Sequence, residues 1–389
     1  MTRGAEHFIK KETFVYLGAE AAYSWSEDFT PRAEGILHIE LARWCDTFVI
    51  APLSANTLSS LAHAQANDLL SSIFLAMGND QKSKLYFPAM NTKMHEHPLV
   101  QKNLQTLKEL PNTYIHPTSV GLLACGEQGE GKLAPVEEIA SLIETLPFSA
   151  FNTQNQKSFL ITTGATIAPL DPVRYMTNSS SGITGLYLAL ASLKLGHKVK
   201  VIAGKHATSK LDELIAHPNF SLERATTNEE MKESVLENFN HFDFYISSAA
   251  ISDFKFSPND GKMKKKDISG HLEIFPDNDI LKDVIALKKK HIIVGFAAET
   301  NLSAETIKEK LERKPVDLLI GTLVHNGLVN QAEQTGFGAD HAHYLIVEEN
   351  DGQRNFNEMT LKKDQLANLV IETCLKKYQT KERNKTAHD

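Results

Sequence analysis

The stretch L-I-T-T-G-A-T-I-A-P-L-D-P-V-R-Y-M-T-N-S-S-S-G, from Leu160 to Gly182, decides the fold of the second half of this chain. Its apolar start predicts a buried strand over 159–163. The small residues from Thr163 to Thr166 predict a turn whose backbone amides can approach phosphates. Asp171-Pro172-Val173-Arg174 predicts a second turn, with a guanidinium suited to a phosphate. The serines and Gly182 open a helix whose positive end favours anions. A serine-capped helix after an irregular loop would also explain these residues, but the length of the run favours a binding site.

Apolar runs alternate with helix-length segments along the rest of the chain. Strands are expected over 47–52, 84–88, 198–203, 242–247 and 292–296, and helices over 98–110 and 182–195. A further helix should be capped near Ser54, and the helix over 182–195 should end at Gly196. The pattern predicts an α/β fold with two doubly wound, Rossmann-like parallel sheets, covered by helices on both faces. Such sheets bind ligands at the carboxyl ends of their strands.

Length and composition indicate a globular protein of two domains. The chain has 389 residues, of which 42% are hydrophobic and 23% are charged, and such a length favours more than one core. The polar, aperiodic stretch 147–157 suits a linker. The polar run from Lys376 to Asp389 is expected to fray. Three cysteines in so long a chain do not form a disulfide framework.

Charge and hydropathy exclude several classes of protein. The formal net charge is −7 and no uninterrupted basic stripe is present, which argues against a nucleic-acid partner. The lysine-rich run 262–266 is local and suggests a small anionic ligand. No run approaches the roughly 20 apolar residues of a membrane span, and no signal peptide opens the chain. We therefore expect a cytoplasmic protein that binds neither nucleic acid nor membrane.

Four short motifs mark the first half: L-H-I-E-L at 37–41, A-P-L-S-A-N-T at 51–57, P-A-M-N-T-K-M at 88–94 and A-C-G-E-Q-G-E-G-K at 124–132. Ser54, Asn56 and Thr57 follow a strand, where hydroxyls, an amide and a helix N-terminus can hold a polar cofactor. Asn91 could grip a carboxylate or an amide, and Cys125 lies in a glycine-rich segment suited to a lid that carries a proton donor. Taken singly, His38 could be a structural histidine, Cys125 an inert thiol and S-A-N-T a helix cap.

Together these motifs resemble the flavin-dependent cysteine decarboxylase family over residues 1–146. The resemblance implies FMN, which takes two electrons from the cysteinyl thiol of the substrate and gives a thioaldehyde that loses carbon dioxide readily. It implies that His38 is the active-site base, Asn91 holds the substrate carboxylate and Cys125 returns a proton. Contacts to FMN are implied for Ser54, Asn56 and Thr57. In the family, a strand, a glycine-containing phosphate loop and a helix precede the segment that starts here at Met1. The resemblance therefore implies an N-terminally incomplete decarboxylase domain: either the true start lies upstream, or this half lacks its usual phosphate anchor.

The second half carries three further motifs. S-A-A-I-S-D-F at 248–254 places Asp253 directly after a strand, G-K-M-K-K-K follows at 261–266, and G-F-A-A-E-T at 295–300 again follows a strand. Lys310 and Lys314 lie four apart on one face of a helix. The lysines at 262–266 could equally belong to a solvated loop.

With the Leu160–Gly182 stretch, these motifs resemble the phosphopantothenate–cysteine ligase family over residues 157–375. The resemblance implies that CTP activates the substrate carboxylate as an acyl cytidylate, that Mg²⁺ neutralises the departing pyrophosphate, and that the amine of cysteine then attacks. It implies that Asn178 serves the acyl cytidylate step and that Lys262 stabilises charge on the phosphates. Contacts to CTP are implied for Asp253, Asn278, Asp279, Ile280, Leu281, Phe296, Lys310 and Lys314. The chain departs from the family pattern at Ala168, normally acidic, at Ile183, often basic, and at Thr322-Leu323, normally Asn-Asp.

We therefore expect a bifunctional enzyme of coenzyme A synthesis, acting on 4'-phosphopantothenate, cysteine and CTP. Its expected parts are a decarboxylase domain over 1–146, a linker over 147–157, a ligase domain over 158–378 and a polar tail over 379–389. A ligase-only chain, with a flavin-deficient first half kept for oligomerisation, and a non-catalytic flavin-binding regulator are the alternatives. An NAD-type dehydrogenase is disfavoured because no G-x-G-x-x-G with a distant acidic residue is present. The resemblance also implies a homo-oligomer, built from decarboxylase trimers and ligase dimers.

Overall fold

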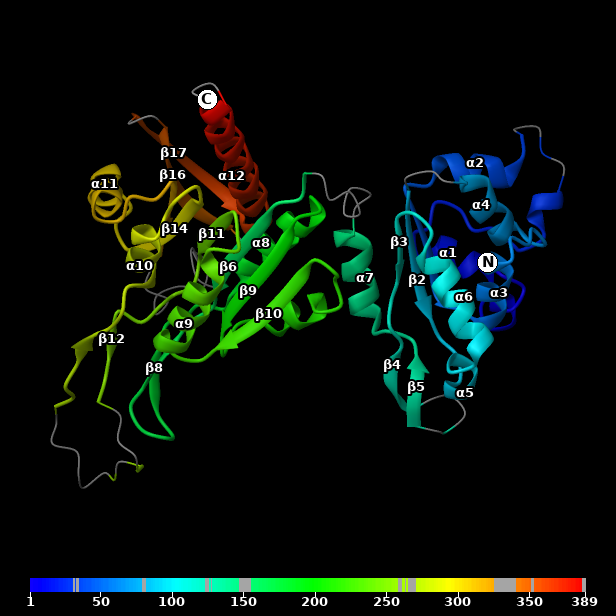
Figure 1. Cartoon of the computed structure of the whole chain (residues 1–389), viewed down its shortest axis with the longest axis horizontal. Coiled ribbons are helices and arrows are strands. Elements are labelled where there is room, and N and C mark those ends of the chain that lie inside the picture. Colours follow the sequence, from blue (N-terminus) through cyan, green and yellow to red (C-terminus); the bar gives the residue numbers. More distant parts are fainter. Residues whose placement is uncertain are drawn as a thin grey trace. The chain divides into compact units, whose positions relative to one another are not determined.

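The structure is a computed structural model, and it divides the chain into two compact units, Met1–Phe151 and Asn152–Asp389 (Figure 1). It describes residues 1–30, 32, 35–78, 82–122, 126, 128–146, 155–257, 261–262, 264, 271–324, 341–350 and 353–386. The expected linker lies mostly outside these residues, as does Cys125. Among the helices that the structure describes, none combines the length and the apolar character needed to cross a bilayer.

The first unit is built on a parallel sheet of three strands in the order β1-β2-β3. These are β1 (Thr47–Leu53), β2 (Ser83–Pro88) and β3 (Thr113–Ile115). The helices are α1 (Lys11–Tyr16), α2 (Leu37–Trp44), α3 (Ala55–Ala62), α4 (Leu69–Met77), α5 (Thr92–His95), α6 (Pro98–Lys108) and α7 (Val136–Thr145), and the short 3-10 turns are η1 (Ala5–His7) and η2 (Glu27–Phe29). An antiparallel ribbon is formed by β4 (Ser119–Leu122) and β5 (Gln128–Lys132). The expected strands and helix of this half are confirmed.

Helix starts in the first unit follow the capping rules that the sequence suggests. The Ser54 side chain accepts the backbone N–H of Thr57 at the start of α3, and Asp68 forms a reciprocal capping box with Ser71 at the start of α4. The core between sheet and helices is formed by Ile50, Leu53, Leu58, Leu61, Phe74, Tyr86 and Leu107. The helix-cap interpretation of S-A-N-T is therefore confirmed, and it leaves the capped end of α3 beside the carboxyl end of β1.

The second unit contains an eight-stranded sheet in the order β10-β9-β6-β11-β14-β15-β16-β17. Its strands are β6 (Ser158–Thr163), β9 (Lys198–Gly204), β10 (Phe220–Ala225), β11 (Phe244–Ser247), β14 (Ile292–Glu299), β15 (Leu318–Leu323), β16 (His341–Asn350) and β17 (Gln353–Lys362). The six strands from β10 to β15 are parallel, and β16 and β17 are antiparallel additions. Taken in chain order, the parallel strands follow the 3-2-1-4-5-6 arrangement of dinucleotide-binding sheets, with the switch point between β6 and β11.

Helices cover both faces of this sheet, as expected (Figure 1). Helices α8 (Ile183–Lys194) and α12 (Lys363–Thr386) pack on one face. Helices α9 (Asn228–Phe239), α10 (Ile280–Ala286) and α11 (Ala304–Arg313) pack on the other. The strands alternate accordingly, because Phe244 and Ile246 join the first core while Tyr245 joins the second. All three are buried, which explains why the strands read as continuous apolar runs.

Smaller elements project from the carboxyl edge of this sheet. They are the ribbon of β7 (Ile167–Pro169) and β8 (Tyr175–Thr177), the ribbon of β12 (Phe254–Lys255) and β13 (Phe275–Pro276), and the 3-10 helix η5 (Ser209–Leu214). Both ribbons extend away from the sheet in Figure 1. The connection between β12 and β13 carries Lys262.

The expectation that the chain frays from Lys376 onward is wrong as far as Thr386, because α12 continues to that residue. The Tyr378 ring is 7% exposed and lies 5.4 Å from the ring of Phe244. Lys377 donates to the carbonyl of Glu349, and Lys381 Nζ lies 2.8 Å from a carboxylate oxygen of Asp317. The polar character of this run therefore reflects specific contacts at the sheet edge.

Candidate functional site

A cavity of about 640 Å³ opens at the carboxyl ends of the parallel strands of the second unit. Its walls come from the N-terminus of α8, the segment after β11, the last part of β14, and the residues around α10 and α11. All but one of the predicted ligase residues line it: Asn178, Asp253, Asn278, Asp279, Ile280, Leu281, Phe296, Lys310 and Lys314. Lys262 is the exception, since it is exposed and is not among the lining residues described. One cavity thus unites residues far apart in the sequence.

Three loops are joined by hydrogen bonds at the switch point of the sheet: those of residues 164–166, of Asn178 and of residues 250–252. Ala250 donates its N–H to the carbonyl of Gly164 at 2.8 Å and accepts the side-chain amide of Asn178 at 3.1 Å. The backbone N–H of Ser252 is donated to Thr166 Oγ1 at 3.0 Å. A side chain at Gly164 would place Cβ 2.7 Å from Cβ of Ala207, and its φ of +75° also favours glycine. Glycine is therefore required at position 164, where the turn approaches Ala207 in the segment after β9.

The turn at Asp171–Arg174 forms as expected, but the guanidinium has another partner. Asp171 Oδ1 accepts the backbone N–H groups of Val173 and Arg174, and Oδ2 accepts Arg174 Nε at 2.9 Å. The Asp171 side chain is fully buried, and Arg174 does not line the cavity. Arg174 therefore fixes the turn that leads into β8, and its suggested phosphate role stays a prediction.

The cavity contains residues that the sequence did not suggest. Tyr344 on β16 and Lys363, the first residue of α12, line it although both are buried. Of the departures from the family pattern, Ile183 and Thr322 line the cavity, whereas Ala168 is buried away from it. The sequence pattern did not predict that Tyr344 and Lys363 line the cavity. Their place there depends on how β16 follows β15 in the sheet and on where α12 begins.

Two lysines of the cavity, Lys310 and Lys314, are paired with carboxylates. Lys314 Nζ lies 2.7 Å from Oδ2 of Asp279, and Lys310 pairs with Glu299. Among the residues that the structure describes, no group of three or more histidine, cysteine or acidic side chains could hold a metal ion. Mg²⁺ commonly needs only one or two carboxylates together with substrate phosphates. Asp253 and Asp279 in the cavity fit that requirement.

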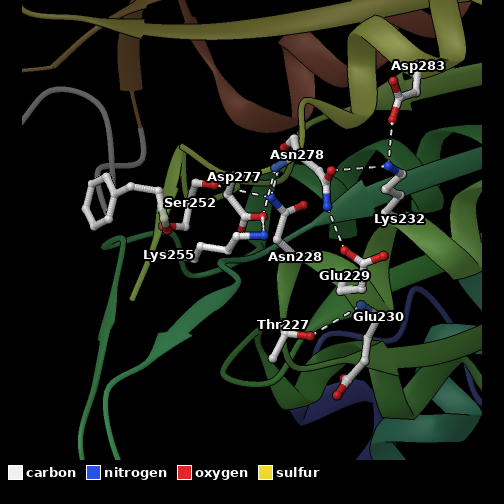
Figure 2. A network of polar contacts seen from close by, with 11 residues as sticks. Thr227, Asn228, Glu229, Glu230, Lys232, Ser252, Lys255, Asp277, Asn278 and Asp283 are labelled. Atoms are coloured by element: carbon white, nitrogen blue, oxygen red, sulfur yellow. Dashed lines mark hydrogen bonds and ion pairs between the residues drawn. The ribbon is translucent and has the colours of Figure 1, made fainter. Parts of the chain in front are cut away.

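The side chain of Asn278 forms hydrogen bonds with two residues of helix α9 (Figure 2). Its Nδ2 donates to Glu229 Oε2 at 2.6 Å, and its Oδ1 accepts Lys232 Nζ at 3.3 Å. Lys232 in turn pairs with Asp283 at 3.0 Å. Both ends of the Asn278 amide are therefore engaged with protein groups.

In the first unit, the predicted cofactor residues follow the strand ends. Ser54 and Asn56 are exposed and Thr57 is partly exposed at the start of α3. Asn91 caps α5 by accepting the N–H of Lys93 at 2.9 Å. Exposed hydroxyls and an amide at the carboxyl end of a parallel strand fit a polar cofactor such as FMN.

The ribbon β4–β5 is pinned to the Asn91 loop on both sides. Met90 donates its N–H to the carbonyl of Gly131 at 2.9 Å, and Thr92 Oγ1 donates to the carbonyl of Glu130 at 2.6 Å. A Cβ on Gly131 would lie 2.2 Å from the Met90 carbonyl oxygen, so this approach requires glycine. Cys125 falls between β4 and β5 in the sequence and lies outside the described residues. The described strand β5 is thus fixed beside Asn91.

His38 lies on α2 and pairs with Asp28. Its Nδ1 is 2.7 Å and 2.9 Å from the two carboxylate oxygens of Asp28. The Asp28 side chain is 5% exposed and that of His38 27%. A carboxylate at Nδ1 holds the proton there, so Nε2 is the nitrogen that can accept a proton. Within the described residues, no hydrogen bond joins His38 to Ser54 or Asn91.

Comparison with known proteins gives matches over both units. Residues 1–146 match the model of the flavoprotein family, and residues 154–378 match that of the DNA/pantothenate metabolism flavoprotein C-terminal domain. The chain is 33% identical to the coenzyme A biosynthesis bifunctional protein CoaBC of Bacillus subtilis, over 99% of this chain and 91% of that protein. It is 31% identical to the protein of the same name from Escherichia coli, over 98% and 90%. A crystal structure of the C-terminal domain of a CoaBC protein matches 58% of this chain and 96% of its own, at 24% identity and a TM-score of 0.44.

Proposed function

Because the chain belongs to the family of coenzyme A biosynthesis bifunctional proteins, we propose that it carries out two consecutive reactions. The ligase domain over 158–378 joins 4'-phosphopantothenate to cysteine with consumption of CTP. The decarboxylase domain over 1–146 then converts the product, phosphopantothenoylcysteine, to 4'-phosphopantetheine. Residues 147–157 link the two, and α12 continues from the ligase domain to Thr386. Relatives match both halves of the chain, and nothing in these matches favours a ligase-only protein.

One observation carries the ligase assignment. The residues that the family resemblance assigns to CTP come from separate strand ends and helix starts, yet they line one cavity at the switch point of the sheet. Anion-binding elements meet there, because the serine run before Gly182 opens α8 and two lysines stand opposite. A cavity with these groups suits a nucleoside triphosphate.

The proposed roles follow from this arrangement. Asn178 is anchored on the carbonyls of Ala250 and Ile251, which sets it at the switch point, where it serves formation of the acyl cytidylate. Lys310 and Lys314 bind the phosphates of CTP, and Lys262 stabilises charge on them from the β12–β13 connection. Mg²⁺, held by Asp253 or Asp279 and the phosphates, would supply further neutralisation of the leaving pyrophosphate.

In the first unit, Ser54, Asn56 and Thr57 would hold FMN, which supplies the oxidation of the substrate thiol when it is bound. His38, oriented by Asp28, accepts a proton at Nε2. Asn91 holds the substrate carboxylate, and Cys125 returns a proton to the product.

We also propose that the protein works as a homo-oligomer. Phe8, Tyr16 and Trp44 are 92%, 90% and 70% exposed in the first unit, and aromatic residues are enriched at interfaces between protein chains. Light scattering of the purified chain tests this, and a monomer would contradict it.

The function is tested with purified protein, 4'-phosphopantothenate, CTP, Mg²⁺ and cysteine. We expect pyrophosphate release that requires CTP and 4'-phosphopantothenate, and formation of phosphopantothenoylcysteine, measured by mass spectrometry, only when cysteine is added. No CTP-dependent product would reject the ligase. Supplying phosphopantothenoylcysteine directly and measuring carbon dioxide, beside the visible absorbance of flavin, tests the decarboxylase independently.

A further inference from the structure

The side chain of Asn228 bonds to two chain segments that reach the cavity from different parts of the sequence (Figure 2). Its Nδ2 donates to the carbonyl of Asn278 at 2.9 Å and to the carbonyl of Ser252 at 3.3 Å. Each of these residues immediately precedes an aspartate that lines the cavity, Asp279 and Asp253 respectively. Asn228 itself does not line the cavity. The side-chain amide of Asn228 thus connects the backbones of two segments of the cavity wall, those of Ser252 and Asn278.

The amide has a rigid support. Asn228 is the first residue of α9 and is only 2% exposed. Thr227 caps this helix by accepting the N–H of Glu230 at 3.3 Å, and Met231 and Val235 bury the helix in the core of the sheet. The position of the Asn228 side chain is therefore fixed by the core, and the two segments are fixed relative to it.

The chemistry of this contact is specific to an amide donor. Both neighbours are carbonyl oxygens, which accept hydrogen bonds, so only the NH₂ group of the side chain can face them. The Oδ1 atom of Asn228 is buried and has no hydrogen-bond partner among the described residues. A buried acceptor without a partner is unfavourable. The asparagine is therefore favoured here by the two bonds that Nδ2 donates, to the carbonyls of Asn278 and Ser252.

The two segments are also bonded to each other and to the same helix. Asp277 donates its N–H to the carbonyl of Asp253 at 3.0 Å, and Glu229, next to Asn228, accepts the side-chain amide of Asn278. Adjacent residues of α9 therefore hold the backbone and the side chain of the same cavity segment.

We propose that Asn228 is a positioning residue of the nucleotide site, which fixes the segments of Asp253 and Asp279 so that the cavity is formed before CTP binds. The identity of the nucleotide rests on the proposed function. Loss of the amide donor leaves the catalytic groups present but lets the two segments move relative to each other. Binding of CTP then has to order them, which weakens CTP binding without altering the site for cysteine.

The test is Asn228→Asp, which preserves size but sets carboxylate oxygens against the two carbonyls. We expect the Kd for CTP, measured by isothermal titration calorimetry on the full chain, to rise at least about tenfold, as for the loss of two ordinary hydrogen bonds. The KM for cysteine should change less than about twofold. If the substitution instead damaged the whole ligase domain, both the Kd for CTP and the KM for cysteine would rise. The matched control is Asn238→Asp on the same helix, where Nδ2 donates to the carbonyl of Ser234 at 2.8 Å. It should leave the Kd for CTP unchanged.

A second variant tests the same proposal in case Asn228→Asp folds poorly. Glu229 is exposed, so Glu229→Ala should fold, and we expect it to raise the Kd for CTP about threefold through loss of the bond to Asn278. Glu233→Ala, exposed one turn further along α9, is its control.

The outcomes separate this inference from the proposed function. Unchanged CTP affinity in both Asn228→Asp and Glu229→Ala, with wild-type ligation intact, overturns the positioning role alone. An equal loss of affinity in Asn238→Asp also overturns it, because helix destabilisation would then explain the effect. A wild-type chain that does not bind CTP overturns both.

Discussion

Lys314 Nζ lies 2.7 Å from Oδ2 of Asp279, whose Oδ1 accepts the backbone N–H of Lys282 at the start of α10. Both partners line the cavity. Their side chains are about 40% and 39% exposed, and ion pairs in such positions contribute little to stability. An incoming triphosphate can therefore replace Asp279 as the partner of Lys314 at small cost.

Lys314→Gln should raise the Kd for CTP about tenfold, because one charge-assisted contact to the phosphates is lost. The variant should also show a weaker dependence of the Kd on salt concentration, since less charge is screened. Titration calorimetry at two salt concentrations measures both effects. Lys308→Gln, exposed on the same helix and outside the cavity, should bind CTP normally. An unchanged Kd for Lys314→Gln would contradict the phosphate role.

Lys262→Ala should slow the reaction without weakening CTP binding, in contrast to Lys314→Gln. Lys262 is exposed and does not line the cavity, so its loss should leave the Kd for CTP and the unfolding temperature unchanged. Pyrophosphate release should fall by about a hundredfold or more, as on loss of a group that stabilises transition-state charge. Lys264→Ala, exposed in the same connection, is the control. Normal pyrophosphate release from Lys262→Ala would reject its proposed role.

The sheets could be predicted because their strands are buried on both faces. The expected strands at 159–163 and 84–88 correspond to Ser158–Thr163 and Ser83–Pro88. The end of β14 was missed, since A-A-E at 297–299 has no strand-like pattern of its own and extends only by pairing with β15. Fraying was expected from Lys376 because local polarity does not show the tertiary contacts of Tyr378.

The candidate site was predictable where it follows the strand ends. Asp253 and Phe296 could be placed because the sequence puts each close to the carboxyl end of a buried apolar run, and parallel strands bind ligands at that end. The contacts of Asn228 could not be predicted from the sequence, because the two carbonyls that it binds, those of Ser252 and Asn278, are distant from it along the chain. The pairing of Arg174 with the buried Asp171 could not be predicted, because the sequence does not show which group a guanidinium contacts.

The Asp317 carboxylate gives a pH-dependent contribution to stability. Burial alone would raise its pKa, but hydrogen bonds from Lys288, Lys381 and the N–H of Ile293 outweigh this and hold the pKa below its usual 3.8. The unfolded chain therefore binds the proton more readily. The stabilisation is present above pH 3.8 and is lost as the pH falls through the folded pKa.

Asp317→Asn should lower the free energy of unfolding at neutral pH by about 1–3 kcal/mol, because the two lysines lose their charged partner. The difference from wild type should narrow as the pH falls below 3.8, where the wild-type carboxylate also becomes neutral. Urea unfolding followed by circular dichroism at several pH values measures this. Asp364→Asn, exposed on α12, should show no such narrowing. A difference that stays constant with pH would contradict the assignment.

Asp28→Asn should separate the two activities of the chain. The Asp28 carboxylate accepts from Nδ1 of His38 at 2.7 Å, whereas an asparagine amide can donate to Nδ1 and move the proton to Nε2. His38 then cannot accept a proton at Nε2, so decarboxylation of supplied phosphopantothenoylcysteine should fall about a hundredfold or more. Ligation and the visible absorbance of bound flavin should remain, and Asp46→Asn, exposed in the same unit, should behave as wild type. If decarboxylation persists in Asp28→Asn while flavin is bound, the proton is removed by a group other than His38 in this tautomer.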